Sequence, residues 1–164
     1  MTAKLRWFLP CAALSLTLDQ TSKLVVLHGL AYGAHFDVID GFFRLTHARN
    51  PGGAWSFLAS APDVVRLPLF VGGTLLGLAA GLIFLRRLEA GARLAAAALG
   101  MIVGGALGNL ADRLVHGAVI DLLDFTLWAG TTWPTFNLAD VFIVVGVALL
   151  VLDLFGTPRA RASS

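Results

Sequence analysis

Two aspartates in this apolar chain have the type and placement for acid–base chemistry. Asp121 follows the stretch Gly117-Ala118-Val119-Ile120, and Asp140 follows Asn137-Leu138-Ala139 just as a long apolar run begins. A carboxylate at the edge of a bilayer is costly unless it is hydrated, paired or protonated, so its presence there indicates a function. Two carboxylates that meet at one site can share a proton and activate a water molecule. We therefore predict that Asp121 and Asp140 lie within a few ångströms of each other.

A purely structural role would also explain these acids. Asn137 stands three residues before Asp140, as a helix N-cap stands before an acid in the first turn, a pattern that stabilises a helix by about 0.5 to 2 kcal/mol. Asp121 and Asp124 would then be solvated loop acids. The spacing of the residues leaves both interpretations open.

The composition indicates a membrane protein. Hydrophobic residues make up 57% of the 164 residues, charged residues make up 13%, and the mean hydropathy is +0.81. The net charge is only +2 and the basic residues are dispersed, which argues against nucleic acid binding. The single cysteine, Cys11, excludes an intramolecular disulfide and is expected to be a small apolar filler.

Four segments are long and apolar enough to cross a bilayer, for which about 20 residues are needed. They are residues 5–27, 67–85, 94–110 and 138–155. Lys4 and Arg6 precede the first segment as they would a secretory signal, but no small-residue cleavage site follows Leu18, so we expect this segment to remain attached.

The distribution of basic residues predicts the orientation. Lysines and arginines concentrate at the two termini and between the second and third spans, at Lys4, Arg6, Arg86, Arg87, Arg93, Arg159 and Arg161. By the positive-inside rule these regions are cytoplasmic. The remaining connections, residues 28–66 and 111–137, would face outward, and they hold most of the acids: Asp37, Asp40, Asp63, Asp112, Asp121 and Asp124.

The first outer segment has signals of local structure. Asp40-Gly41 lies between two apolar-rich runs, which predicts a β-hairpin at the membrane surface. Asn50-Pro51-Gly52-Gly53 then breaks the chain, and Ala54 to Leu58 would form a short interfacial helix with Trp55 at headgroup depth. We therefore expect an all-α membrane protein of one domain, residues 1–164, with four transmembrane helices, a small outer hairpin platform and a short interfacial helix.

Polar residues within the spans predict further contacts. Asp19 and Lys23 are four residues apart and can pair on one helical face, either to neutralise each other or to support the site. Asn109 and Arg113 are also four apart, and Arg113 could recognise an anionic or carbonyl-bearing substrate. Asn50 before proline could serve similarly or simply form a turn.

Glycines spaced four residues apart predict close helix packing. They are Gly77 and Gly81 in the second span and Gly100, Gly104 and Gly108 in the third. The four histidines, in contrast, lack paired ligand spacing; they are His28, His35, His47 and His116. No metal and no cofactor are therefore expected.

Five blocks in order along the chain resemble the prolipoprotein signal peptidase family, signal peptidase II. They are Asp19-Gln20-x-x-Lys23, Asn50-x-Gly52, Gly104-Gly105-Ala106-Leu107-Gly108-Asn109-Leu110-x-Asp112-Arg113, Val119-Ile120-Asp121-x-x-Asp124-Phe125 and Phe136-Asn137-Leu138-Ala139-Asp140. The resemblance implies a four-helix membrane aspartyl protease that removes the signal peptide of bacterial lipoproteins at the lipid-modified cysteine. It implies Asp121 and Asp140 as the catalytic dyad. It implies supporting or substrate-binding roles for Asp19, Lys23, Asn50, Asn109, Arg113 and Asn137.

The chain departs from the family at one point. After the asparagine the family usually reads Gly-Ala-Ala-Phe-Ser, whereas this chain has Gly52-Gly53-Ala54-Trp55-Ser56. An additional glycine and a larger aromatic would change loop stiffness and lipid contact without touching the dyad.

The expected partners are lipid-modified prolipoproteins and membrane lipids, and the protein is expected to act as a monomer in the bacterial cytoplasmic membrane, with its site at the outer face. A small proton-coupled carrier or channel is the alternative, in which Asp19, Lys23 and Asp140 would line a polar path. The absence of an obvious inverted repeat argues against a carrier.

Overall fold

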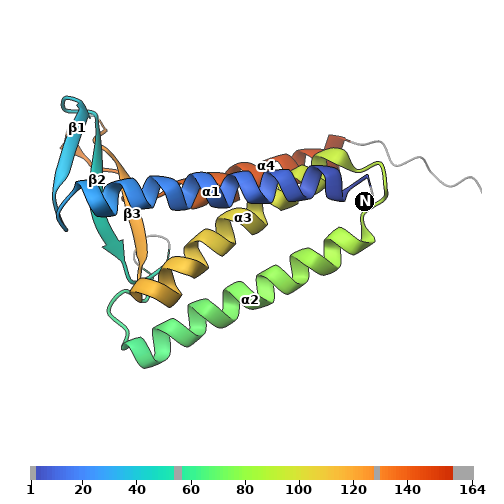
Figure 1. Ribbon diagram of the computed structural model, residues 1–164, viewed down its shortest axis with the longest axis horizontal. Coiled ribbons are helices and arrows are strands. Elements are labelled where there is room, and N and C mark those ends of the chain that lie inside the picture. Colours follow the sequence, from blue (N-terminus) through green and yellow to red (C-terminus); the bar gives the residue numbers. More distant parts are fainter. Residues whose placement is uncertain (1–2, 54–56, 128–129, 157–164) are drawn as a thin grey trace, which may run out of the picture.

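The computed structural model describes residues 3–53, 57–127 and 130–156. Its helices are α1 (Leu5–Gly29), α2 (Asp63–Arg87), α3 (Arg93–His116) and α4 (Leu138–Gly156), and its strands are β1 (His35–Ile39), β2 (Phe43–Asn50) and β3 (Val119–Phe125). Figure 1 shows the strands at one end of the helices, with the N-terminal end, the α2–α3 connection and the end of α4 at the other. The first and third connections therefore meet at the sheet.

The four predicted spans coincide with the four helices. Helices α2, α3 and α4 are long and apolar enough to cross a membrane, with mean hydropathies of 2.0, 1.8 and 2.6 over their most apolar stretches. Helix α1 is 25 residues long but includes the charged residues Asp19 and Lys23, and its crossing remains a prediction. All four helices extend beyond their predicted bounds, most of all α2, which begins at Asp63, and α3, which ends at His116, because a helix can continue past its most apolar stretch.

Helix α3 is the central helix, since 61% of its apolar stretch is buried inside the protein, against 11% for α4 and none for α2. Small residues bring its neighbours close. A Cβ added at Gly100 or Gly104 would lie 2.4 Å from a backbone oxygen of α1, and one at Gly105 would lie 2.5 Å from the Ala139 oxygen of α4. The predicted close packing is confirmed here, but it is wrong for Gly77, where a Cβ would meet no atom within 4 Å.

The predicted hairpin is confirmed, but an all-α class is wrong. β1 and β2 pair antiparallel across the Asp40-Gly41 turn, where Gly41 has φ +70°, a conformation that glycine adopts without strain. β3 then pairs antiparallel with β2 and completes a three-stranded sheet of order β1-β2-β3. The third strand comes from the second outer segment, so its pairing depends on contacts between residues far apart in the sequence.

Two turns determine how the chain enters and leaves this sheet. Gly117, with φ +70°, ends α3 and donates its N–H to the Arg113 oxygen, so that β3 begins two residues later. The predicted interfacial helix at 54–58 lies mostly outside the described residues, and Phe57–Ser60 form turns.

At the end of the helices opposite the sheet, Lys4 Nζ donates to the backbone oxygens of Arg86 and Leu88 at 2.8 and 2.9 Å, which caps the end of α2.

Candidate active site

Asp121 is placed by the third strand. It lies opposite Ala48 of β2, and its side chain is nearly inaccessible, with the residue 1% exposed. Residues 136 and 137 run alongside β3, because Leu123 N donates to the Phe136 oxygen at 2.8 Å and Phe136 N donates back at 3.1 Å. Asn137 is thereby held next to Asp121, and its Nδ2 donates to Asp121 Oδ1 at 2.7 Å.

Asp140 is placed by the start of the fourth helix. Its backbone N–H donates to Asn137 Oδ1 at 3.1 Å, and the Asn137 N–H donates to Asp140 Oδ2 at 3.3 Å. This reciprocal arrangement is a helix cap, so the structural interpretation of Asn137 and Asp140 is correct. It does not exclude chemistry, because Asn109 Nδ2 also donates to Asp140 Oδ1 at 2.9 Å and orients the carboxylate from α3.

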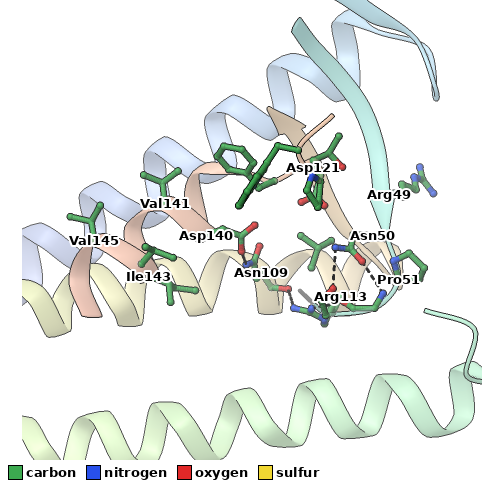
Figure 2. A pocket seen from close by; sticks show the side chains of 18 residues that line it. Arg49, Asn50, Pro51, Asn109, Arg113, Asp121, Asp140, Val141, Ile143 and Val145 are labelled. Atoms are coloured by element: carbon green, nitrogen blue, oxygen red, sulfur yellow. Dashed lines mark hydrogen bonds between the residues drawn. The ribbon is translucent and has the colours of Figure 1, made fainter. Parts of the chain in front are cut away.

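The two aspartates line one cavity of about 700 Å³. Figure 2 shows Asp121 and Asp140 on this cavity, with Asn109 beside Asp140. Asn137 connects them, since it bonds to both carboxylates. The apolar part of the lining includes Trp133, Pro134, Phe136, Val141, Ile143, Val144 and Val145. The cavity therefore combines two acids with an apolar wall.

The surroundings of Asp121 favour a bound proton. Its pKa is raised from 3.8 to about 7, first because burial disfavours the charged carboxylate and also because of the negative charge of Asp140. Hydrogen bonds from Asn137 and Asn50 and the positive charge of Lys23 oppose the rise. A carboxyl group that titrates near neutral pH can hold and release a proton under physiological conditions.

A buried group of three charges lies behind the cavity. Lys23 Nζ is 2.8 Å from Asp19 Oδ2 and 2.7 Å from Asp112 Oδ2, and the three side chains are at most 4% exposed. Gln20 Nε2 donates to both carboxylates at 3.1 Å. Gly108 makes room for the group, because a Cβ there would lie 2.3 Å from Asp19 Oδ2. We call Asp19, Lys23 and Asp112 the ionic triad.

Each member of the ionic triad bonds to a residue that adjoins Asp121 or Asp140 in the chain or is hydrogen-bonded to one of them. Asp19 Oδ1 accepts from the N–H of Ala139, the residue before Asp140, at 2.9 Å. Asp112 Oδ2 accepts from the N–H of Ile120, the residue before Asp121, at 3.0 Å. Lys23 Nζ donates to Asn109 Oδ1 at 3.1 Å. The triad thus fixes β3, α4 and Asn109 relative to one another.

Arg113 and Asn50 line the cavity from the side of the β2–α2 connection (Figure 2). Arg113 donates to the Asn109 oxygen at 3.2 Å and to the Gly52 oxygen at 3.1 Å. Asn50 Oδ1 accepts from the Gly52 N–H at 3.0 Å, which is the turn-forming role its sequence context predicts. Because Asn50 also lines the cavity, it combines that role with access to a bound molecule.

The structure brings all eight predicted site residues to the cavity or directly behind it. Asp112 is the residue to which sequence reasoning assigned no role, although its position four residues after Gly108 and three after Asn109 places it on the same helical face. Within the described ranges, no cluster of three or more histidine, cysteine, aspartate and glutamate side chains could hold a metal ion.

Known proteins resemble this chain over nearly its whole length. The family model described as "Signal peptidase (SPase) II" matches residues 11–156. The lipoprotein signal peptidase of Geobacter metallireducens is 42% identical over 162 residues, covering 99% of this chain and 98% of that protein. That of Ralstonia nicotianae is 47% identical over 138 residues, covering 83% and 76%.

A solved structure has the same fold. A bacterial membrane enzyme determined by the in meso method at 2.3 Å resolution matches with a TM-score of 0.80 and 28% sequence identity, covering 94% of this chain and 91% of the other. The sequence matches, the shared fold and the cavity with two aspartates all indicate the same family. The chain belongs to the signal peptidase II family of aspartic peptidases.

Proposed function

We propose that Asp121 and Asp140 are the catalytic pair with which this membrane peptidase removes signal peptides from lipid-modified prolipoproteins. One observation carries the assignment: the two carboxyl groups line a single cavity and are both hydrogen-bonded to Asn137. Because the pKa of Asp121 is about 7, this residue can carry the proton that the pair needs near neutral pH.

The mechanism follows from the two carboxyl groups. Asp140 takes a proton from a water molecule, and the water oxygen attacks the scissile carbonyl carbon. Asp121, protonated at the start, donates its proton to the carbonyl oxygen. When the carbon–nitrogen bond breaks, the leaving amine takes up the proton that Asp140 received, and Asp121 regains its own as the carboxylic acid forms. Asn109 and Asn137 hold the carboxylates in place through this cycle.

The apolar wall supports a substrate that enters from the membrane. A signal peptide is an apolar helix, and residues Val141, Ile143 and Val144 offer it an apolar surface beside Asp140. Asp140 lies two residues into α4, about 3 Å of rise from its start. The diacylglyceryl chains of the substrate cysteine would remain among the lipids.

We propose that all four helices cross the cytoplasmic membrane, with both termini inside and the sheet outside. The basic residues support this orientation. Figure 1 shows the N-terminal end of α1 and the C-terminal end of α2 opposite the sheet, and Lys4, Arg86 and Arg87 belong to these ends. Topology reporters test it. A reporter fused to either terminus should be found in the cytoplasm, and a reporter inserted in the Asp40-Gly41 turn should be found outside. An external C-terminus would contradict the arrangement.

Substitution of the two aspartates tests the catalytic assignment. Asp121→Asn and Asp140→Asn keep polar side chains of similar size but cannot exchange a proton, so cleavage of a lipid-modified precursor should fall by about 10² to 10⁴. Asp37→Asn, on the exposed strand β1, is the control that retains activity. Thermal melts in detergent show whether each variant is folded. Near wild-type cleavage by either dyad variant would refute the assignment.

The carrier hypothesis is wrong for this chain. The chain belongs to a peptidase family. Its buried ionisable groups are gathered at one place, since the ionic triad bonds to the residues that precede Asp121 and Asp140. A proton path would need ionisable groups distributed across the bilayer.

A further inference from the structure

Helix α2 makes few contacts near the sheet, and Phe70 is an exception. A Cβ added at Gly72, Gly73 or Gly77 would meet no atom within 4 Å, so this part of α2 stands apart from its neighbours. Phe70, in contrast, is half-buried, and its ring lies against Arg113, with the guanidinium carbon 4.9 Å from the ring centroid. The ring thus connects α2 to a residue of the cavity.

The guanidinium of Arg113 is held on several sides. Its Nη1 donates to the backbone oxygen of Asn109 and its Nη2 to the backbone oxygen of Gly52, while its Cζ lies over the Phe70 ring. Each terminal nitrogen has two hydrogens, so each keeps a donor after these bonds. Arg113 lines the cavity, and a planar fork of donors suits the carbonyl groups of a bound peptide.

Gly53 provides the space that Phe70 occupies. A Cβ at Gly53 would lie 3.0 Å from Phe70 Cε1 and 3.3 Å from Cζ, closer than ordinary van der Waals contact. The absence of a Cβ at Gly53 therefore leaves room for the Phe70 ring.

We propose that Phe70 is a positioning residue for substrate binding, which fixes the Arg113 guanidinium at the cavity, and that Gly53 is required because it admits the ring. This proposal rests on the proposed function, because Arg113 is taken to contact the peptide that Asp121 and Asp140 cleave. Phe70 is not among the residues that line the cavity, so its loss weakens binding of the peptide through Arg113 and leaves the proton transfers unchanged.

Phe70→Leu tests the role of the ring, since leucine is apolar but has no π face. Cleavage of a synthetic lipid-modified precursor in mixed micelles should show KM raised roughly 3- to 30-fold, the range expected for loss of a cation–π contact. The kcat should stay within about 3-fold of wild type. Phe70→Tyr keeps the ring and should restore KM. Phe36→Leu is the matched control, because Phe36 is exposed on β1, and it should leave both constants unchanged.

A double-mutant cycle tests the role of Gly53. Gly53→Ala should raise KM as Phe70→Leu does, and should add little in the Phe70→Leu background, because the methyl group acts only by displacing the ring. An unchanged KM in Phe70→Leu, a loss confined to kcat, failure of Phe70→Tyr to restore KM, or additive effects in the cycle would each overturn the proposal. Asp140→Asn in the same assay separates the two claims, since its cleavage would refute the dyad whatever the Phe70 variants show.

Discussion

Lys23 and Asp112 form an ion pair of 2.7 Å although both side chains are at most 4% exposed. Lys23 also pairs with Asp19 at 2.8 Å, so one ammonium group neutralises part of the charge of two buried carboxylates. Buried charges are tolerated only when they are paired and hydrogen-bonded. The bonds of the ionic triad to Ala139, Ile120 and Asn109 supply the remaining partners and fix the backbone next to Asp140 and Asp121.

Lys23→Met should destabilise the protein by about 3 to 5 kcal/mol, because it leaves two buried carboxylates without a counter-ion. Activity should fall as well, since β3 and α4 lose their common anchor. A thermal melt in detergent and a cleavage assay measure the two effects. Asp63→Asn is the control, because Asp63 pairs with Arg66 but its side chain is 73% exposed, and its change should stay below about 1 kcal/mol. Equal stability of the two variants would contradict the role of the triad.

Gly108→Ala should cost about 1 to 3 kcal/mol, because the added methyl group would lie 2.3 Å from Asp19 Oδ2 and force the ionic triad apart. Gly77→Ala is a matched helical control. No atom lies within 4 Å of a Cβ there, so alanine should be neutral or stabilise α2 by about 0.5 to 1 kcal/mol. Comparison of the two melting temperatures checks the prediction, which fails if the variants behave alike.

The pH dependence of stability should depend on Asp121. Its pKa is raised from 3.8 to about 7 by burial and by Asp140, against the hydrogen bond from Asn137. A raised pKa means that the folded state holds the proton more tightly than the unfolded chain does. The contribution of Asp121 to stability is therefore fully present below about pH 4 and is lost as the pH rises through about 7. Asp121→Asn should flatten the fall of the melting temperature over this window, and an unchanged slope would contradict the assignment.

The two roles of Asn137, as a helix cap and as a hydrogen-bond donor to Asp121, should be separable by mutation. Asn137→Ala removes the helix cap, at about 0.5 to 2 kcal/mol, and removes the donor to Asp121, which raises the pKa of Asp121 further. Asn137→Ser keeps a capping oxygen, but its shorter side chain should not reach Asp121. We expect the serine variant to melt near wild type and both variants to lose activity. Full activity of Asn137→Ser would show that the bond to Asp121 is dispensable.

The sequence predicted the groups that local spacing can identify. Asp19 and Lys23 share a helical face because they are four residues apart, and their ion pair is confirmed. The N-cap of Asn137 is confirmed for a similar reason, since it depends on residues three apart. The Asp40-Gly41 hairpin is also a local feature, because the turn residues determine which strands pair.

Two features that depend on distant residues, the third strand and the position of Asp112, were not predicted. The strand Val119–Phe125 owes its conformation to β2, about 75 residues earlier in the chain, and pairing over such a separation leaves no local signal. Asp112 was grouped with the outer acids because α3 was expected to end at residue 110, whereas the helix continues to His116. Only the packing of α1 on α3 shows that Asp112 faces Lys23.

The hydrogen bond from Ala139 to Asp19 has a consequence for biogenesis. It joins residues 120 positions apart, from the first helix and the last. Translation delivers the chain from its N-terminus, so α1 and α3 are made before Ala139, and until then Asp19 lacks this donor. The arrival of α4 supplies that N–H together with Asp140. A ribosome-bound or truncated chain without α4 lacks both Asp140 and the N–H group that joins Asp19 to α4, and under the proposed assignment it cannot cleave a precursor.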